Sequence, residues 1–561
     1  MPITLRTGLP AARTGRRGGD GAGRGVPSSA SSGPLNAGRA YLLMIALLLA
    51  LGLSFQGTRG IWEPDEGFYV NVAKGLLDRG ELLIPRLNGE IFLDKPPLIY
   101  WGMIASIRAF GLSEWSVRLP HALYFIGTAL LICSLGTRLW DRSTGIVAAV
   151  VYSTTLAPFL AANVLTPDTP LAAFVALFFL SYWRATTSDG SPRRPWWWLL
   201  AGAAVGLGVL AKGPAMMVFV APAVAHLVWT RGARTALATP MAWWGAAVAL
   251  LVGLPWYLYV VGTIPGAGDY ILDNEIVGRL FTARYRRHPQ WYGALLVYIP
   301  MLTFGALPWS VIWIGKLGRL FRDGPRRRAT RRRDPARAML LLWLAIPACV
   351  LLLARSRLYL YVLPLYAPAA LLTARGLKSA LESAGGLLLS RRCALLLLAW
   401  SMLLVGLKLG ASHWGGRRDT RAVARALDRE LGSTPVEVVA VDLKLNALPF
   451  YGFDNFEWVT RSARQYPYYA SLRTLDDRIS TLPPTSRPVA FILTPDRAAE
   501  TEGALTGAGA DCRAAPLTEF DSLLLCKAAA DGSGAAMAAR VNRSKPIRPS
   551  EAVVGIQVTV E

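Results

Sequence analysis

Three short acidic segments beside prolines contain the side chains best placed to do chemistry. They hold Asp65 with Glu66, Asp94, and Asp168. Pro64 suits the first turn of a helix, so Asp65 and Glu66 would stand beside the positive end of the helix dipole, where a carboxylate stays ionised. Asp168 follows Pro167 at a second predicted helix start. An ionised carboxylate facing a polar cavity could act as a general base or as a cation ligand. Helix capping is the alternative, most directly for Asp168.

Basic side chains near these carboxylates indicate an anionic ligand. Lys95 stands at a predicted helix start, where its charge opposes the helix dipole unless an anion is also bound there. Arg355 and Arg357 lie in a very short turn, and Arg279 lies in a longer loop. Arginine binds phosphate oxygens in a bidentate way, so a phosphate site is predicted. Contact with phospholipid headgroups is the alternative for all these cations, and Lys212 is open to the same two interpretations.

Two short helices are predicted to carry the first two acidic segments. Apolar residues at helical spacing follow Pro64 until Gly80 ends the run, which predicts an amphipathic helix lying on a membrane surface. A second helix is expected to start at the proline pair Pro96-Pro97. Asp168 would open a membrane span, and Lys212-Gly213-Pro214 would break two spans at the same level.

The chain as a whole has the composition of a polytopic membrane protein. It has 561 residues, of which 53% are hydrophobic, and its mean hydropathy is positive. Apolar runs long enough for a bilayer predict about eleven spans. They lie near 41–56, 118–139, 145–162, 167–184, 196–211, 214–230, 241–261, 291–315, 338–354, 358–375 and 391–410. The net charge of +24 does not indicate nucleic-acid binding, because the cations gather in loops between apolar runs.

The positive-inside rule orients these spans. The most basic loops fall on one side if the N-terminus is cytoplasmic, and the acidic segments then face outward. The expected organisation is an all-α membrane domain with a small C-terminal α/β periplasmic domain. Its parts are a disordered basic N-terminus over 1–39, the membrane domain over 40–410 with outer loops 57–117 and 262–290, the α/β domain over 411–528, and a flexible tail over 529–561.

The α/β domain is predicted from short alternating segments. A helix is expected near 420–431, strands at 436–442, 488–494 and about 521–526, and a turn at Leu448-Pro449-Phe450-Tyr451. Cys512 and Cys526 both fall in this domain, and in an oxidising compartment they could form a disulfide or remain unpaired. The other cysteines lie in or beside spans and suit packing.

Several reaction classes lack their parts here. The four histidines are scattered without an i, i+4 pair, so a histidine-rich metal site has little support. The sequence contains neither a Gly-rich phosphate loop nor a nucleophile elbow. Energy-coupled transport would usually place ionisable residues in mid-span, whereas these lie at span ends.

In these residues the chain resembles the bacterial aminoarabinose transferases of lipid A, and more distantly the protein O-mannosyltransferases, within the C-type glycosyltransferases. The likeness runs along most of 60–370 and depends on the order of several short motifs. These are Pro64-Asp65-Glu66-Gly67-Phe68-Tyr69, Asp94-Lys95-Pro96-Pro97, Leu165-Thr166-Pro167-Asp168, Lys212-Gly213-Pro214, Pro255-Trp256-Tyr257 with Gly278-Arg279-Leu280, Leu307-Pro308-Trp309, and Ser356-Arg357-Leu358-Tyr359-Leu360-Tyr361-Val362-Leu363-Pro364.

The resemblance implies a helical membrane domain whose cavity opens outward. Asp65 matches the family's key catalytic carboxylate, and Asp168 matches a second acidic residue of the cavity. The positions expected to hold the carrier phosphate are Lys95, Arg279 and Tyr361. The family's pattern is not kept at three positions: it usually has arginine at Phe68, glutamate at Asp94 and histidine near Ile276.

The predicted function is sugar transfer from a polyprenyl-phosphate carrier to lipid A or another envelope acceptor, at the periplasmic face of a bacterial inner membrane. Asp65, Glu66 and Asp168 are the expected catalytic residues. The carrier phosphate would bind to Lys95, Arg279, Arg355, Arg357 and Tyr361, and the substrate also to Tyr69, Asp94, Lys212 and Glu275. A divalent ion on Asp65, Asp94 and Asp168 is open but not required. The alternatives are a protein or polysaccharide transferase of the same fold and a lipid-linked sugar flippase.

Overall fold

The computed structural model describes residues 34–187, 192–278, 282, 287–313, 334–383, 391–414, 416, 418–432, 436–461, 473–481 and 488–528. The chain divides into two compact units, Met1–Leu43 and Met44–Glu561, and the residues predicted to do chemistry lie in the second. The predicted N-terminal segment up to residue 33 and the predicted tail from residue 529 lie outside the described residues.

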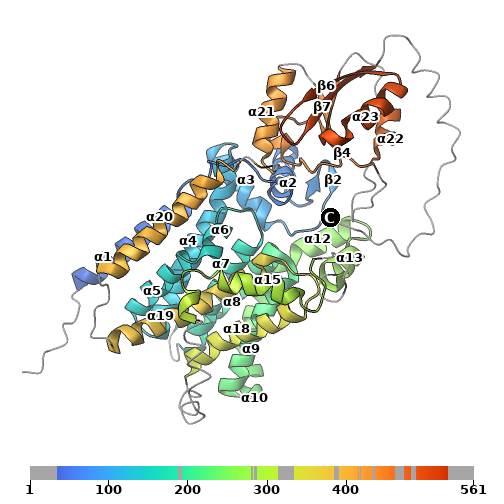
Figure 1. The fold of residues 1–561 in the computed structure, drawn as a ribbon. Coiled ribbons are helices and arrows are strands. Elements are labelled where there is room, and N and C mark those ends of the chain that lie inside the picture. The colour runs from blue at the N-terminus through green and yellow to red at the C-terminus, as the bar shows by residue number, and fades with distance from the viewer. Residues whose placement is uncertain are drawn as a thin grey trace, which may run out of the picture. The chain divides into compact units, whose positions relative to one another are not determined.

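Each of the eleven predicted spans contains helix (Figure 1). The helices are α1 (Pro34–Leu53), α4 (Glu114–Leu139), α5 (Arg142–Ser153), α6 (Leu156–Ala161), α7 (Asp168–Thr187), α8 (Arg194–Lys212), α9 (Met217–Arg231), α11 (Pro240–Gly253), α12 (Pro255–Thr263), α15 (Gly293–Thr303), α18 (Pro335–Leu353), α19 (Tyr366–Ser383) and α20 (Arg391–Ala411). Within the described ranges, five helical segments are long and apolar enough to cross a membrane, or six if one bent pair counts as a span.

Prolines and glycines divide several of the predicted spans. α11 and α12 meet at Pro255 with a bend of 40°, as expected where proline removes a helix hydrogen bond. α8 ends at Lys212, and Gly213 takes a positive φ of 66° before a 3-10 turn, η1 (Gly213–Met216), leads into α9. The predicted break at Lys212-Gly213-Pro214 is therefore confirmed, and it leaves Lys212 at a helix end.

The segment between α1 and α4 has the two predicted helices and a small hairpin. α2 (Asp65–Arg79) ends at Gly80 in the left-handed conformation, and α3 (Leu98–Phe110) begins after Pro97. Strands β1 (Arg86–Leu87) and β2 (Glu90–Ile91) pair between them. The apolar side of α2 packs on α3 and on Ala447, Phe450 and Trp458 of the C-terminal domain, so protein and not lipid covers it.

The C-terminal domain is a five-stranded mixed sheet with helices, drawn in orange to red in Figure 1. Its strand order is β4-β3-β5-β7-β6, with β4 and β5 parallel to β3, and β7 antiparallel to β5 and β6. The elements are α21 (Thr420–Leu431), β3 (Glu437–Val441), η5 (Leu448–Tyr451), β4 (Phe456–Val459), α22 (Leu475–Ser480), β5 (Val489–Leu493), α23 (Pro495–Gly507), β6 (Ala510–Pro516) and β7 (Ser522–Ala528). Cys512 and Cys526 face each other across β6 and β7 and form a disulfide.

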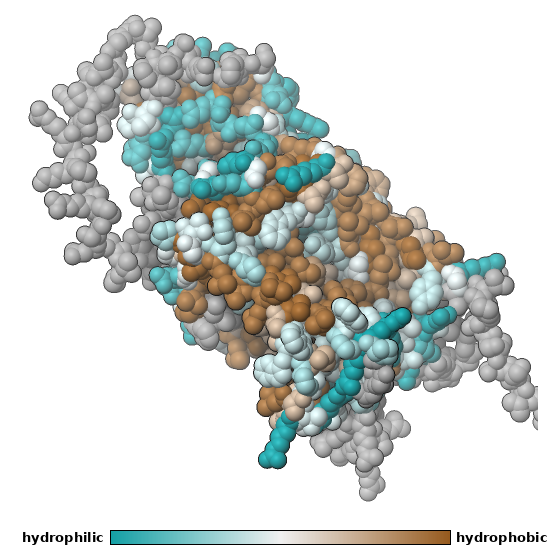
Figure 2. Space-filling model, turned by 180° about the vertical axis from the view of Figure 1, so that it is seen from behind, coloured by the Kyte–Doolittle hydropathy of each residue, from teal (hydrophilic) through white to brown (hydrophobic). Residues whose placement is uncertain are grey.

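The surface of the helical part is strongly apolar. Figure 2 shows hydrophobic side chains gathered over one face between hydrophilic regions. The exposed apolar side chains include Leu251, Leu396 and Leu403.

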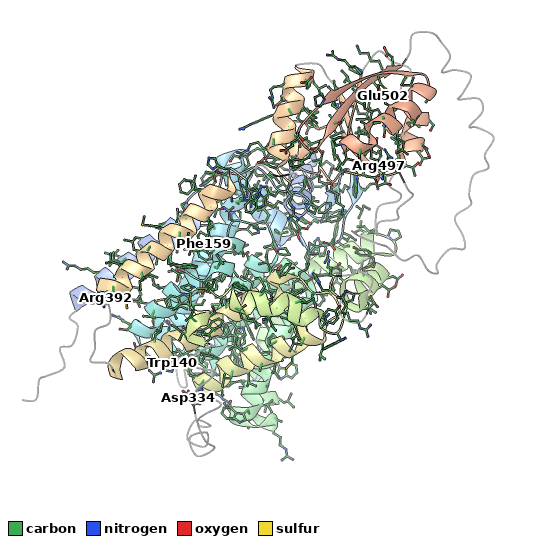
Figure 3. All side chains as sticks on the ribbon, in the orientation of Figure 1. Trp140, Phe159, Asp334, Arg392, Arg497 and Glu502 are labelled. Atoms are coloured by element: carbon green, nitrogen blue, oxygen red, sulfur yellow. A yellow bond between two sulfur atoms is a disulfide. The ribbon has the colours of Figure 1, made fainter. Side chains whose placement is uncertain are left out.

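One cation, Lys408, is buried among these helices. Lys408 of α20 donates to the Leu51 carbonyl at 2.8 Å, near the end of α1, and its Nζ lies 4.9 Å from the ring centroid of Phe159, which is labelled in Figure 3. The free carbonyls at a helix end favour such a cation.

Candidate active site

Asp65 is the first residue of α2, and its side chain is exposed. Pro64 precedes it and makes no side-chain cap, so the first N–H groups of the helix are not occupied by a capping side chain. The helix dipole stabilises the Asp65 carboxylate at this end. An accessible carboxylate at this position can face a bound substrate and receive a proton from it.

Tyr69 lies one helical turn after Asp65. Burial raises the pKa of the Tyr69 hydroxyl well above its ordinary value, and interactions with Asp94, Tyr100, Asp65 and Asp168 raise it further. Asp94 precedes α3 and Asp168 begins α7. The three acidic segments that the sequence singled out therefore all act electrostatically on this hydroxyl.

Asp168 is held in a defined orientation by two neighbours. The Lys212 ammonium donates to Asp168 Oδ1, and the Thr166 hydroxyl donates to Oδ2 at 2.9 Å. The Lys212 Nζ also lies 4.0 Å from the ring centroid of Tyr361. Since Asp168 is only 4% exposed, this pairing compensates a charge that would otherwise be costly to bury. Asp168, Lys212 and Tyr361 thus form one contiguous group.

Lys95 is paired with its own neighbour. Its Nζ donates to Asp94 Oδ2 at 2.5 Å and to the Asp94 carbonyl at 2.9 Å, and the residue is 8% exposed. α3 starts three residues later and has no side-chain cap at Pro97. A phosphate at this helix start would meet free N–H groups and a lysine together.

Two tyrosines that sequence reasoning did not treat as site residues border the same region. The Tyr298 hydroxyl is buried, has no hydrogen-bond partner among the described residues, and interacts electrostatically with Asp168 and Tyr361. The Tyr257 hydroxyl lies so near Gly213 that an added Cβ would stand 3.1 Å away, and it interacts with Glu275. A tyrosine in an apolar run is typical of a helix core, so the pattern at Tyr298 offers no signal. Tyr257 stands in the Pro255-Trp256-Tyr257 motif, which was the one signal available for it.

Glu66, for which a catalytic role was predicted, is enclosed by protein partners. It is 2% exposed, and Arg59 donates to it at 2.6 and 2.7 Å while Arg118 donates at 2.9 Å. The N–H groups of Trp62 and Leu165 complete its partners. Burial alone would raise the pKa of Glu66, but the two arginines hold it well below its ordinary value. Its oxygens are therefore occupied by protein donors.

Arg357, for which a phosphate-binding role was predicted, donates from both terminal nitrogens to backbone carbonyls, while its buried Nε has no hydrogen-bond partner among the described residues. Its Nη1 donates to the carbonyls of His288 at 2.5 Å and Gln290 at 2.7 Å, and its Nη2 donates to that of Leu352 at 3.2 Å. The guanidinium is 3% exposed and ties the short turn to the loop before α15. Arg355 is exposed, and Arg279 lies outside the described residues.

A metal site receives no support from the described geometry. Within the ranges that the structure describes, no three His, Cys, Asp or Glu side chains gather at a distance suitable for one ion. Two of the metal candidates already have ammonium partners: Asp94 pairs with Lys95, and Asp168 pairs with Lys212. We therefore derive no step through a metal.

Comparison with known sequences identifies two related groups. The family model described as dolichyl-phosphate-mannose-protein mannosyltransferase matches residues 94–259. The undecaprenyl phosphate-alpha-4-amino-4-deoxy-L-arabinose arabinosyl transferase of Erwinia tasmaniensis is 30% identical over 347 residues, which cover 61% of this chain and 60% of that protein. Its namesake from Pseudomonas paraeruginosa is 30% identical over 353 residues, covering 61% of each chain. The chain thus spans about three fifths of the length of the curated relatives it matches.

The solved structures agree at the level of fold. The crystal structure of ArnT from Cupriavidus metallidurans bound to undecaprenyl phosphate superposes with a TM-score of 0.69 and 19% identity, covering 87% of this chain and 98% of that one. The Archaeoglobus fulgidus oligosaccharyltransferase has a TM-score of 0.51 and 13% identity, covering 85% and 73%. The chain therefore shares the fold of these two proteins. The sequence resemblance to the aminoarabinose transferases is also confirmed.

Proposed function

We propose that this chain is a membrane glycosyltransferase that moves a sugar, as a pentosyl or hexosyl group, from undecaprenyl phosphate to lipid A. The observation that carries the proposal is the pair of buried lysines bound to Asp94 and Asp168, together with the exposed carboxylate of Asp65 at the start of α2. All three carboxylates act electrostatically on Tyr69. The names of the relatives supply the carrier and favour 4-amino-4-deoxy-L-arabinose as the sugar. The site would face the periplasm from the inner membrane.

The proposed reaction exchanges one bond at the anomeric carbon of the sugar. An acceptor oxygen bonds to this carbon while the bond to the carrier phosphate breaks, and undecaprenyl phosphate leaves with the electron pair. Lys95, with Arg279, stabilises the negative charge that develops on the leaving phosphate. Asp65 receives the proton of a hydroxyl acceptor. For an ionised phosphate acceptor, its charge instead stabilises the positive charge that builds on the sugar.

The remaining polar groups are assigned to the sugar. Asp94 and Asp168 both act electrostatically on Tyr69, and the oxygens of the three side chains can accept from an amine or from hydroxyl groups. Lys212 orients Asp168, and Tyr361 lies against Lys212. Glu275 and Tyr257 extend this polar lining toward η2 (Ile271–Val277).

The test is mass spectrometry of lipid A and of extracted undecaprenyl-phosphate sugars from cells with the gene deleted, restored, and restored as Asp65→Asn. Asp78→Asn is the matched control, because Asp78 is an exposed carboxylate on the same helix. We expect a sugar-sized mass to disappear from lipid A on deletion and with Asp65→Asn, with carrier-linked sugar accumulating, and to remain with Asp78→Asn.

Other outcomes redirect the assignment. If lipid A is unchanged while carrier-linked sugar accumulates, the protein is still a transferase but its acceptor is a protein or a polysaccharide. The match to the mannosyltransferase family model would agree with a protein acceptor. No change in either pool would overturn the proposed reaction and return attention to transport.

A further inference from the structure

The C-terminal domain contacts the polypeptide on both sides of Asp65. Two residues before Asp65, the N–H of Glu63 donates to the Arg418 carbonyl at 2.9 Å, and the Thr420 N–H donates to the Ile61 carbonyl at 3.1 Å. Six residues after Asp65, the Asn71 side chain donates to the Asn446 carbonyl at 2.8 Å. At about 1.5 Å rise per helical residue, the second contact lies less than two turns from Asp65.

The Glu63 carboxyl makes the contact nearest to Asp65. Its Oε1 accepts from the Ala447 N–H at 2.7 Å and from the Thr420 hydroxyl at 3.3 Å, and the residue is 7% exposed. The same carboxyl packs directly against the first turn of α2, because a Cβ added at Gly67 would collide with it. Glu63 therefore lies between the C-terminal domain and the helix start that presents Asp65.

Three asparagines form the second contact and extend it toward Asp94 and Lys95. The Asn71 amide also donates to Asn88 Oδ1 at 2.8 Å, and Asn88 lies in the turn between β1 and β2. The Asn88 amide donates to Asn446 Oδ1 at 3.2 Å. The C-terminal domain is thus hydrogen-bonded both to α2 and to the hairpin that leads to Asp94.

Apolar packing makes this arrangement rigid. Ala447 and Phe450 belong to the same buried core as Val70, Val72 and Ile99, so the core of α2 and α3 continues into the C-terminal domain. Close-packed interiors have little freedom to deform, and a helix held at two points and along one side keeps its orientation.

We propose that the C-terminal domain positions the catalytic carboxylate Asp65, with Glu63 and Asn71 as the positioning residues. This rests on the proposed function, in which Asp65 acts on the acceptor or the sugar. Glu63 acts through hydrogen bonding to Ala447 and Thr420 and not by proton transfer, since its carboxyl is buried against protein. A carboxylate displaced by a fraction of an ångström from its productive position loses much of its effect on rate.

The test uses the purified full-length protein, undecaprenyl-phosphate 4-amino-4-deoxy-L-arabinose as donor and lipid A as acceptor. Turnover at saturating donor, KM for donor, binding of undecaprenyl phosphate alone, and melting temperature are measured for each variant. We expect Glu63→Ala and Asn71→Ala to lower turnover roughly 10- to 100-fold per folded molecule while KM stays near the wild-type value. Glu63→Gln keeps the oxygen that accepts from Ala447 and should retain most of the turnover.

Two controls separate the outcomes. Asp454→Ala removes an exposed ion pair between Lys74 and the C-terminal domain, at the far end of α2, and should leave turnover unchanged. Asp65→Asn tests the proposed function itself. Full turnover in that variant would overturn the catalytic role of Asp65, and with it the role of the C-terminal domain in positioning this residue. If Glu63→Ala and Asn71→Ala lower the melting temperature but leave turnover unchanged, these contacts contribute only to stability and the positioning role is overturned. An inactive Glu63→Gln would overturn the inference in favour of a role for the Glu63 charge.

Discussion

At the scale of the residue, the buried cations divide into two kinds. A buried arginine can indicate an anionic ligand, yet Arg59 and Arg118 share the Glu66 carboxylate, and Arg357 donates to three backbone carbonyls. Lys95 and Lys212 instead pair with carboxylates of the site itself. The described buried arginines thus hold loops together, whereas the two lysines are paired with carboxylates of the candidate site.

Replacing Glu66 should therefore affect stability before chemistry. Glu66→Gln leaves two buried guanidinium groups without their full counter-charge, and breaking a buried pair costs about 3–5 kcal/mol. We expect a large fall in melting temperature in detergent, with Asp78→Asn close to wild type because Asp78 is exposed. A Glu66→Gln protein that melts like wild type and has lost turnover would restore the catalytic role.

Glu63 should make stability depend on pH. Burial raises the pKa of the Glu63 carboxyl from 4.5 to about 8. Hydrogen bonds from the Ala447 N–H, Thr420 and Asn446 lower this pKa but do not offset burial, and the charge of Glu66 raises it further. The folded chain keeps a proton that the unfolded chain loses above pH 4.5, so this contribution to stability is complete below that pH and is lost as pH rises through about 8. Between about pH 5 and about pH 8, the melting temperature of the wild type should fall relative to that of Glu63→Gln, whose side chain does not ionise. Parallel curves would contradict the shift.

At the scale of the element, close helix packing depends on glycine. Gly202 of α8 lies against the backbone of Gly245 in α11, and a Cβ on Gly202 would collide with the Gly245 carbonyl. Gly206 and Gly253 repeat the close approach further along the same pair of helices. Small residues allow helices to approach in membranes, where lipid supplies no hydrophobic drive between them. This contact helps fix α8, at whose end Lys212 pairs with Asp168.

Widening that contact should destabilise the protein and disturb the site. Gly202→Ala forces α8 and α11 apart, and overpacking typically costs about 1–3 kcal/mol. Gly127→Ala in α4 is the control, because an added Cβ there meets nothing within 4 Å. We expect a lower melting temperature and reduced turnover for Gly202→Ala only. Equal behaviour of both variants would show that the helices relax without cost.

At the scale of the whole molecule, the candidate site draws on segments far apart in the chain. α2 and the start of α3 carry Asp65, Asp94 and Lys95, while α7, the end of α8 and the 3-10 helix η4 (Tyr359–Leu365) carry Asp168, Lys212 and Tyr361. A ligand that joins these segments should stabilise the folded chain as a unit, because it binds only where they are assembled.

Undecaprenyl phosphate should therefore raise the melting temperature. At a hundredfold excess over its Kd, a ligand of the folded state adds about 2.7 kcal/mol to stability. We expect Lys95→Ala to need a much higher ligand concentration for the same shift, and Arg425→Ala, which removes an exposed cation of the C-terminal domain, to behave as wild type. Identical titrations for all three proteins would place the phosphate away from Lys95.

The local elements of the site could be read from sequence because their signals are local. Pro64, Gly80 and the Pro96-Pro97 pair predicted the ends of α2 and α3, and both are confirmed. Strands β3, β5 and β7 are apolar and were predicted, whereas β4 and β6 lie at the sheet edges, and β6 contains Asp511, Arg513 and Pro516. Edge strands carry polar residues and proline, so their pattern does not separate them from loops.

The sequence by itself determined the class of protein, the helix ends and which carboxylates to consider, since hydropathy, proline and glycine act on neighbouring residues. Only the tertiary structure decided which of these charges are enclosed by protein partners and which stay accessible. Asp65 and Glu66 are adjacent in sequence, yet one is exposed at a helix start and the other is enclosed by Arg59 and Arg118. Successive helix residues point about 100° apart, and partners such as Arg118 come from distant segments, so the division between chemistry and structure depends on the packed fold.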